Sequence, residues 1–149
     1  MTRPKKRKAV LPRVFLNASL SNISAQNLNI KIKKILEEEG FSCILPQEIL
    51  PPGTKVHPSE ILRQNVEFVK KSDIVLSVLD SPGEGVIFEL GFAHALGKPI
   101  VAFRSNEASY LGKIIEGLWS ALPGSKKAVT IDELRTKLKC LHAEWRPPT

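Results

Sequence analysis

The chain has 149 residues, of which 42% are hydrophobic and 25% are charged, which is the balance of an ordinary globular domain. This composition excludes a disordered, collagen-like or coiled-coil chain, and no apolar run is long enough to span a bilayer. The two cysteines, Cys43 and Cys140, form neither a metal-binding spacing nor a disulfide framework, and the start is not a secretory signal. We therefore expect a cytoplasmic protein with no membrane contact, no metal ion and no cofactor.

The net charge of +7 is concentrated near the start of the chain. Basic residues up to Arg13 contribute +6 and no acidic residue precedes Glu37, so the remainder is close to +1, from 7 − 6. We predict a basic, disordered tail over residues 1–12 and one α/β domain over 13–149. A solvated tail is the simplest interpretation, while contact with nucleic acid, or a nuclear address in a eukaryotic cell, stays open. The nearly neutral domain argues against nucleic acid as its partner.

Short apolar segments alternate with segments of helical periodicity. Gly40 and the Pro51-Pro52-Gly53 run are typical chain breakers, and Thr130 with Glu133 is typical of a helix start. We predict strands at 14–16, 41–45, 73–79, 99–103 and 128–130. The predicted helices cover 22–39, 59–71, 85–96, 111–122 and 130–142, and residues 46–58 are predicted to form a loop.

Strands that alternate with helices favour right-handed crossovers and a parallel sheet. The pattern predicts a flavodoxin-like three-layer sandwich around a five-stranded parallel sheet in the order 2-1-3-4-5. Ligands of such sheets bind at the carboxyl ends of the strands, where the strand order reverses. We therefore expect residues 17–22 and 80–89 to meet there.

Glu89 lies in the predicted helix 85–96, which is apolar nearly all round and is therefore expected to be buried. A carboxylate in such surroundings costs free energy unless it is paired or hydrogen-bonded. Its place about one turn from the helix start favours the ionised form, which suits a nucleophile or a general base. The alternative is a structural glutamate bonded to backbone or to an arginine.

The two loops expected to meet are polar, and both lead into helices. Their free backbone N–H groups can hold a phosphate or a sugar hydroxyl. We predict that they face each other across a polar pocket, with ordinary helix capping as the alternative. The residues expected to contribute are Asn17, Ser19, Ser21, Asp80, Ser81, Gly83 and Gly85.

The stretch 65–104 resembles the nucleoside 2-deoxyribosyltransferase family, which includes deoxynucleoside 5'-monophosphate N-glycosidases and cytidine-monophosphate hydrolases. The resemblance rests on Glu89-Leu90-Gly91-Phe92-Ala93 and on Gly97-Lys98-Pro99, and it extends over most of residues 13–120. It implies cleavage or exchange of the N-glycosidic bond of a (deoxy)nucleoside or its 5'-monophosphate. Glu89 would attack the anomeric carbon, and water or a second base would resolve the covalent glycosyl intermediate.

The resemblance also implies further site residues. Gln47 and Glu48 match the region that lines the base pocket, and Lys113 falls where a neighbouring subunit completes the site in relatives. The apolar segments 86–96 and 111–119 agree with a homodimer or larger homo-oligomer that shares its sites.

Three positions depart from the family pattern. Phe15 replaces a tyrosine that steadies the nucleophile, and Asn65 replaces an aspartate that assists the leaving base. Gly83 matches neither the aspartate of transferases nor the serine of monophosphate hydrolases. Phe15 and Asn65 favour a second interpretation, a nucleotide-binding module with lost or weak catalysis, whereas Glu89 favours an enzyme. The base, the sugar, the 5' group and the choice between transfer and hydrolysis stay open.

Overall fold

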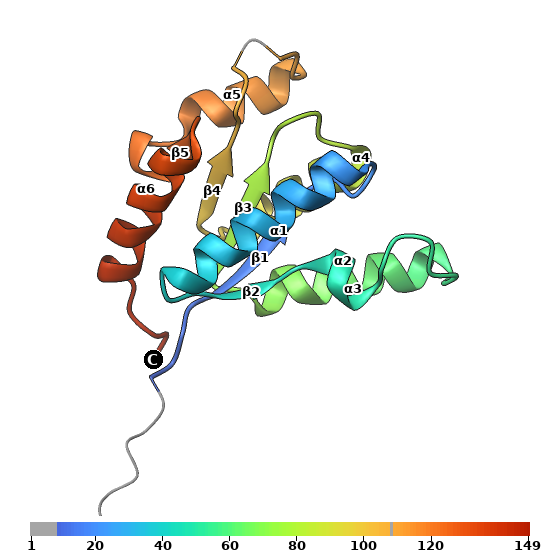
Figure 1. The fold of residues 1–149 in the computed structure, drawn as a ribbon, viewed down its shortest axis with the longest axis horizontal. Helices are drawn as coiled ribbons and strands as arrows, with labels where there is room; N and C mark the ends of the chain where they lie inside the picture. The colour runs from blue at the N-terminus through green and yellow to red at the C-terminus, as the bar shows by residue number, and fades with distance from the viewer. Residues whose placement is uncertain (1–8, 108) are drawn as a thin grey trace, which may run out of the picture.

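The computed structural model describes residues 9–107 and 109–149 and contains the predicted five-stranded parallel sheet (Figure 1). Its strands are β1 (Arg13–Asn17), β2 (Ser42–Ile44), β3 (Ile74–Val78), β4 (Ile100–Phe103) and β5 (Lys127–Ala128). Their order is β2-β1-β3-β4-β5, and every neighbouring pair is parallel. The predicted α/β sandwich and its strand order are confirmed.

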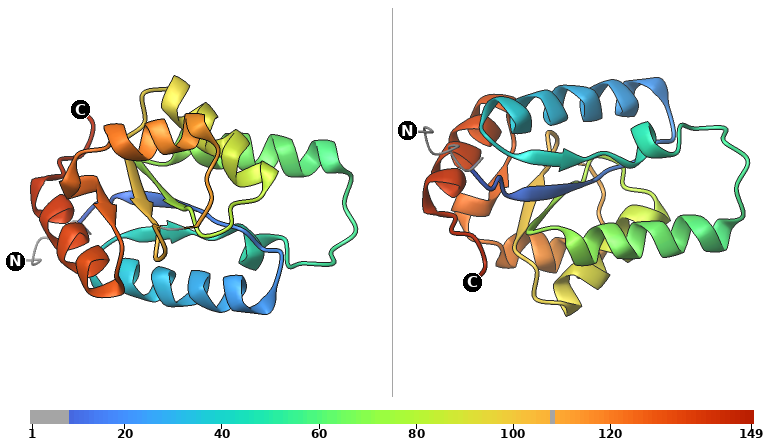
Figure 2. Two further views of the ribbon diagram at one scale, coloured as in Figure 1. Left: turned by 90° about the horizontal axis from the view of Figure 1, so that it is seen from above. Right: turned by 90° about the horizontal axis from the view of Figure 1, so that it is seen from below.

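Helices cover both faces of the sheet, as the two views of Figure 2 show. One face is covered by α1 (Ile23–Glu38) and α6 (Ile131–Glu144). The other is covered by α3 (Pro58–Lys71), α4 (Glu84–Ala95) and α5 (Lys113–Ala121). Each face has its own apolar core: Ile32 and Leu134 belong to the first, and Phe15 and Leu90 to the second.

Local signals account for most of the element boundaries. Asn22 caps α1 by accepting a hydrogen bond from the Ala25 backbone N–H at 2.8 Å. The side chain of Thr130 caps α6 by accepting from Glu133 N at 3.1 Å. Gly40 ends the α1 segment with a φ of +92°, a left-handed conformation that glycine adopts without a steric penalty.

The structure corrects two expectations about the elements. The predicted loop 46–58 contains a short helix, α2 (Pro46–Ile49), because proline fits the first position of a helix. The prediction that helix 85–96 is buried is wrong, since only Val86, Leu90 and Ala93 of α4 are buried and Phe88 is 52% exposed. Helix α4 lies in the outer layer of the sandwich, so only one of its faces meets the sheet.

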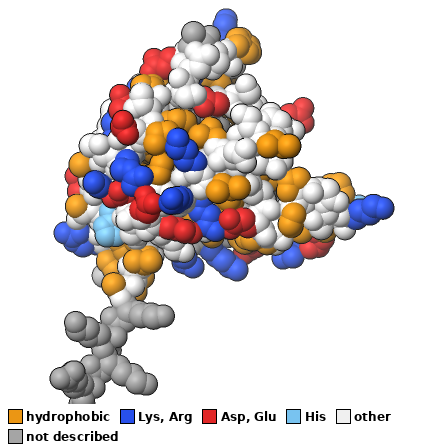
Figure 3. Space-filling model, viewed as in Figure 1, with side chains coloured by type: hydrophobic (Ala, Val, Ile, Leu, Met, Phe, Trp, Pro, Cys, Tyr) orange, Lys and Arg blue, Asp and Glu red, His pale blue; other side chains and the backbone are white. Residues whose placement is uncertain are grey.

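Residues 1–8 of the predicted basic tail lie outside the described residues. Within its described part, Pro12 is buried and its carbonyl accepts a hydrogen bond from Ser42 N at 3.0 Å. Over α1 and α6, the face in Figure 3 shows basic side chains among acidic ones, and Arg135 pairs there with Glu38 and Glu39. No helix within 9–107 or 109–149 is long and apolar enough to cross a membrane.

Candidate active site

A pocket of about 250 Å³ lies at the carboxyl end of the sheet, on the side of α3 and α4. It brings together the loop after β1 and the turn before α4, as the sequence predicts. Glu89 and Asn65 line it together with residues from both segments. The other lining residues are Ala18, Ser19, Leu20, Ser21, Pro46, Gly83, Gly85 and Val86.

Glu89 is partly buried in this pocket, and Asn65 from α3 contacts it directly. The Asn65 side-chain amide donates to Glu89 Oε1 at a distance of 2.6 Å. Burial raises the pKa of Glu89 from 4.5 to about 7, and the bond from Asn65 opposes that rise. The expectation that the helix start favours the ionised form is thus outweighed by burial. The carboxyl changes charge near neutral pH, a useful property for a nucleophile or a base.

The position of Asn65 depends on how α3 ends. Lys98, in the Gly97-Lys98-Pro99 motif, donates from its ammonium group to Lys70 O at 2.8 Å and to Ser72 O at 2.7 Å. A cation that binds the last carbonyls of a helix satisfies acceptors that have no partner within the helix. The motif therefore has a structural role here, because it ties α3 to the connection between α4 and β4.

Asn17 is fully buried beneath the pocket and does not line it. Its side-chain amide donates to Ser77 Oγ and to Val86 O, both at 3.0 Å. These contacts join the carboxyl ends of β1 and β3 to the first turn of α4, the helix that carries Glu89. The structure therefore places Asn17, predicted as a substrate contact, among the supports of the site.

Phe15 also lies away from the pocket. It is fully buried in the core between the sheet and α3, with its ring centroid 6.3 Å from that of Phe68. Side chains alternate along a strand, so Phe15 and Asn17 face the same side, and Phe15 is two residues further from the carboxyl end. Phe15, which matches the position of the family's tyrosine, therefore does not line the Glu89 pocket, and its predicted part in the substrate site stays a prediction.

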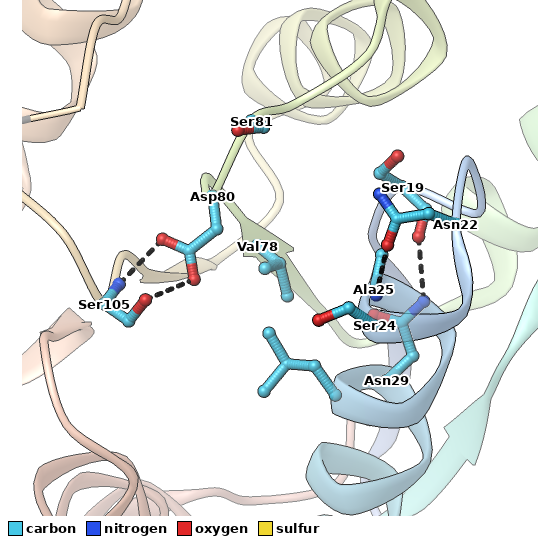
Figure 4. Close-up of a pocket in the computed structure, with 10 residues that line it drawn as sticks. Ser19, Asn22, Ser24, Ala25, Asn29, Val78, Asp80, Ser81 and Ser105 are labelled. Atoms are coloured by element: carbon cyan, nitrogen blue, oxygen red, sulfur yellow. Dashed lines mark hydrogen bonds between the residues drawn. The ribbon is translucent and has the colours of Figure 1, made fainter.

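Asp80 and Ser81 line a different cavity of about 420 Å³, on the α1 side of the sheet (Figure 4). Asp80 accepts hydrogen bonds from Ser105 N at 2.8 Å and from Ser105 Oγ at 2.7 Å. Ser19 borders both this cavity and the Glu89 pocket. The single polar pocket predicted from the sequence is thus two cavities, separated by the loop after β1.

Two pockets of the described chain contain Glu89 or Asn65, and neither is lined by Gln47, Glu48 or Lys113. Gln47 accepts a hydrogen bond from Asn29 at 2.9 Å, and Glu48 pairs with Lys33. Their neighbour Pro46 lines the pocket instead. Lys113 is exposed at the start of α5, so its predicted contribution to a neighbouring subunit's site stays a prediction.

A second, mainly apolar pocket of about 180 Å³ adjoins the first and was not predicted. Leu20, Pro46 and Asn65 border both pockets. The additional walls are Leu50, Pro51, Pro52, Gly53, Thr54, Val56, Ile61 and Gln64. The signal in the sequence was the presence of Leu50 and Val56 in a segment otherwise typical of a solvated loop.

The buried carboxyl generates a prediction about stability. The Glu89 carboxyl ionises near 4.5 when unfolded and near 7 when folded, so the folded state binds the proton more tightly between these values. The free energy of unfolding of the natural chain should therefore fall as pH rises from about 4.5 to about 7. Glu89→Gln accepts the Asn65 bond without ionising, so it should be the more stable protein above pH 7.

Chemical denaturation at a series of pH values measures this difference, which should disappear below about pH 4.5. Glu84→Gln is the matched control, because Glu84 is exposed in the first turn of the same helix. A Glu89→Gln variant no more stable than the natural chain at pH 8 would contradict the inferred cost of ionisation.

Known proteins resemble the chain in both sequence and fold. A relative from Thermofilum pendens named "Putative 2'-deoxynucleoside 5'-phosphate N-hydrolase 1" is 24% identical over 138 residues, covering 76% of this chain and 96% of the relative. The 5-hydroxymethyl-dUMP N-hydrolase of Rattus norvegicus is 32% identical over 87 residues, which is 56% of this chain. This chain matches about half of the rat enzyme, 51% of its length.

Two solved structures share the fold. The 2-deoxyribosyltransferase of Bacillus psychrosaccharolyticus superimposes with a TM-score of 0.59 at 21% identity, covering 69% of this chain and 79% of that one. The CMP N-glycosidase of Clostridium botulinum has a TM-score of 0.59 at 20% identity, covering 87% of this chain and 98% of that one. The family model for nucleoside 2-deoxyribosyltransferase matches residues 14–139, a range that includes Asn65 and Glu89. The chain therefore belongs to the nucleoside 2-deoxyribosyltransferase family.

Proposed function

We propose that the chain is an enzyme that breaks the N-glycosidic bond of a deoxynucleoside 5'-monophosphate, with Glu89 as its nucleophile. The observation that carries this proposal is the partly buried Glu89 carboxyl, held in a pocket at 2.6 Å from the Asn65 amide. Membership of the family supports the bond that is attacked. Attack of a Glu89 oxygen on the anomeric carbon releases the base and leaves a glycosyl ester, which splits one difficult substitution into two easier ones.

The two adjoining pockets differ in polarity, and each suits a different part of the substrate. The apolar pocket formed by residues 50–56 and α3 suits the flat face of a base. The Glu89 pocket has the hydroxyls of Ser19 and Ser21 on one side, and these suit the sugar. Asn65 borders both pockets, so the bond to be broken lies at the boundary between them.

The start of α4 supports a phosphate at the 5' end. Gly83 and Gly85 line the pocket, and Gly83 has no side chain to occupy the first-turn N–H groups of α4. Such groups, together with the positive end of the helix dipole, favour an anion. The names of the two curated relatives, both hydrolases of deoxynucleotides, agree with this assignment.

The phosphate assignment predicts a preference between two substrates with the same base. A deoxynucleoside 5'-monophosphate should be turned over with at least tenfold higher kcat/KM than its deoxynucleoside, a difference of about 1.4 kcal/mol in transition-state binding. Chromatography of the released base measures both rates. A tenfold preference for the free nucleoside would contradict the assignment, and repeating the reaction with an added acceptor base separates transfer from hydrolysis.

The central experiment tests Glu89 itself. Glu89→Gln and Glu89→Ala should both lose base release by a factor of about a thousand or more, since neither side chain can form the glycosyl ester. Glu84→Gln, on the exposed first turn of α4, is the control and should retain turnover within a few-fold. Turnover like that of the natural chain in either Glu89 variant would refute the proposal.

A nucleotide-binding module with weak catalysis is the second candidate. It is favoured by the position of Phe15, which is buried in the core and has no hydroxyl to steady the nucleophile. Saturable nucleotide binding by calorimetry, without base release from any substrate, would identify the chain as such a module.

The exposed side of α4 supports a homodimer. Phe88 stacks on Phe92 with ring centroids 6.5 Å apart, and a cavity of about 390 Å³ separates α4 from the start of α5. Ile114 in α5 is 86% exposed. Exposed apolar groups of this size mark contact surfaces, and the exposed Lys113, expected to reach a neighbouring subunit's site, precedes Ile114 in the same helix.

Light scattering tests this assembly. The natural chain should have the mass of a dimer or a larger oligomer at micromolar concentration, and Phe88→Glu should reduce it because a charge would be buried in the contact. Ile30→Glu is the control, since Ile30 is similarly exposed on α1 in the opposite layer. A monomeric mass for the natural chain would contradict the proposed dimer.

A further inference from the structure

The cleft formed by the two adjoining pockets contains a single titratable side chain among the described residues that line it. That side chain is Glu89. All other polar side chains on its walls are hydroxyls or amides, namely those of Ser19, Ser21, Thr54, Gln64 and Asn65. None of them can give up a proton as an acid at neutral pH.

His57 precedes α3, and its side chain bonds to the start of that helix and not to the cleft. Its side chain caps α3, with Nδ1 accepting from Ser59 N at 3.2 Å and lying 2.7 Å from Ser59 Oγ. It is exposed and does not line the cleft. The described residues that line the cleft therefore offer a nucleophile without a matching general acid.

The lack of a general acid among the residues that line the cleft restricts which bases can leave. Enzymes that cleave glycosidic bonds by this route use two carboxyl groups, one to attack and one to protonate the group that leaves. A positioned acid contributes about 10²–10⁴-fold to the rate. Without it, the base has to depart with the electron pair of the broken bond and without a proton from the enzyme.

We propose, on the basis of the function assigned above, that this cleft selects pyrimidines that leave as stable anions, namely uracil and thymine, over cytosine. In uracil and thymine the charge left on the ring nitrogen spreads onto two carbonyl oxygens. Cytosine has one carbonyl and an amino group in place of the other, so its anion is less stable. It leaves readily only after a ring nitrogen has been protonated.

The amides of the cleft suit this departure. One N–H group of the Asn65 amide donates to Glu89, and the Asn65 side chain borders the apolar pocket as well. Gln64 lies beside it on α3 and also lines that pocket. Neutral N–H donors stabilise charge that develops on a carbonyl oxygen, although they cannot transfer a proton to a ring nitrogen.

The step balances without a further reactant. A Glu89 oxygen forms a bond to the anomeric carbon while the bond from that carbon to the base nitrogen breaks, and the electron pair leaves with the base. The base anion takes its proton from water after departure. Water then attacks the anomeric carbon of the ester, and the bond from that carbon to the Glu89 oxygen breaks, which restores the Glu89 carboxylate and releases the sugar. The proton lost by this water neutralises the hydroxide that was left when the base was protonated.

The test compares substrate pairs that differ only in the base. Deoxyuridine and deoxycytidine, and separately their 5'-monophosphates, are incubated with the full chain, and base release is followed by chromatography. The uracil substrate should have at least tenfold higher kcat/KM within each pair. Equal rates, or faster release of cytosine, would overturn the proposal by showing that an acid reaches the cleft from elsewhere.

Asn65→Asp provides the second arm. Two carboxyl groups this close share one proton, so the substitution supplies the missing acid beside Glu89. The preference for uracil over cytosine should fall at least tenfold in this variant, whatever its absolute rate. An unchanged preference would contradict the proposal. Asn27→Asp makes the same chemical change at an exposed position of α1 and should leave the preference unaltered.

Purine substrates separate this inference from the function on which it rests. The 5'-monophosphates of deoxyadenosine and deoxyinosine are included in the same assay. Release of purines without a preference for uracil over cytosine would refute the leaving-group proposal alone. No release of any base would refute the enzymatic function itself.

Discussion

The hydrogen bond between Asn65 and Glu89 joins the two helices whose packing forms the site. It spans 24 positions of sequence and holds a carboxyl that is partly removed from water. The bond requires α3 and α4 to keep a fixed separation, and polar contacts hold each helix at one end. Lys98 binds the carbonyls at the end of α3, and Asn17 binds the Val86 carbonyl in the first turn of α4. An apolar side chain in place of Asn17 would leave the Val86 carbonyl without this partner in a buried position.

The site is formed at a cost to stability. Burial opposes ionisation of Glu89, and in the unfolded chain this carboxyl would be free to ionise in water. A carboxylate that is poorly solvated is also a stronger nucleophile, so the same burial that lowers stability at high pH serves the proposed attack. The Asn65 bond limits the cost without abolishing it, because one amide hydrogen bond replaces only part of the lost hydration.

The sequence predicted the fold well because alternation of strand and helix patterns leaves few topologies for a parallel sheet. The place of Glu89 beside two meeting loops was predicted for the same reason, since parallel strands bring their carboxyl ends to one edge. The contact of Asn65 with Glu89 was beyond pattern analysis, because it depends on the angle at which α3 packs on α4. The burial of Phe15 in the core was missed because the alternation of side chains along a strand shows which face a residue is on. It does not show how far that residue lies from the carboxyl end of the sheet. The exposure of Phe88 was missed because a helix that is apolar all round has no stripe to show which face the sheet covers.

The loop after β1 decides how the carboxyl end of the sheet is shared between cavities. It is tied to α1 by amide side chains, since Gln26 donates to Leu20 O at 2.9 Å and Asn29 to Ser19 O at 3.0 Å. Its position is therefore set by the α1 layer, whereas Glu89 belongs to the α4 layer on the opposite face. The pocket between them is lined on one side by this loop and on the other by the start of α4. The proposed glycosyl ester on Glu89 would form where the two layers meet, beside Ser19, Leu20 and Ser21 of this loop. Hydrolysis and transfer to a second base differ in the access of water to that ester, so the position of the loop bears on the choice between them as much as the nucleophile does.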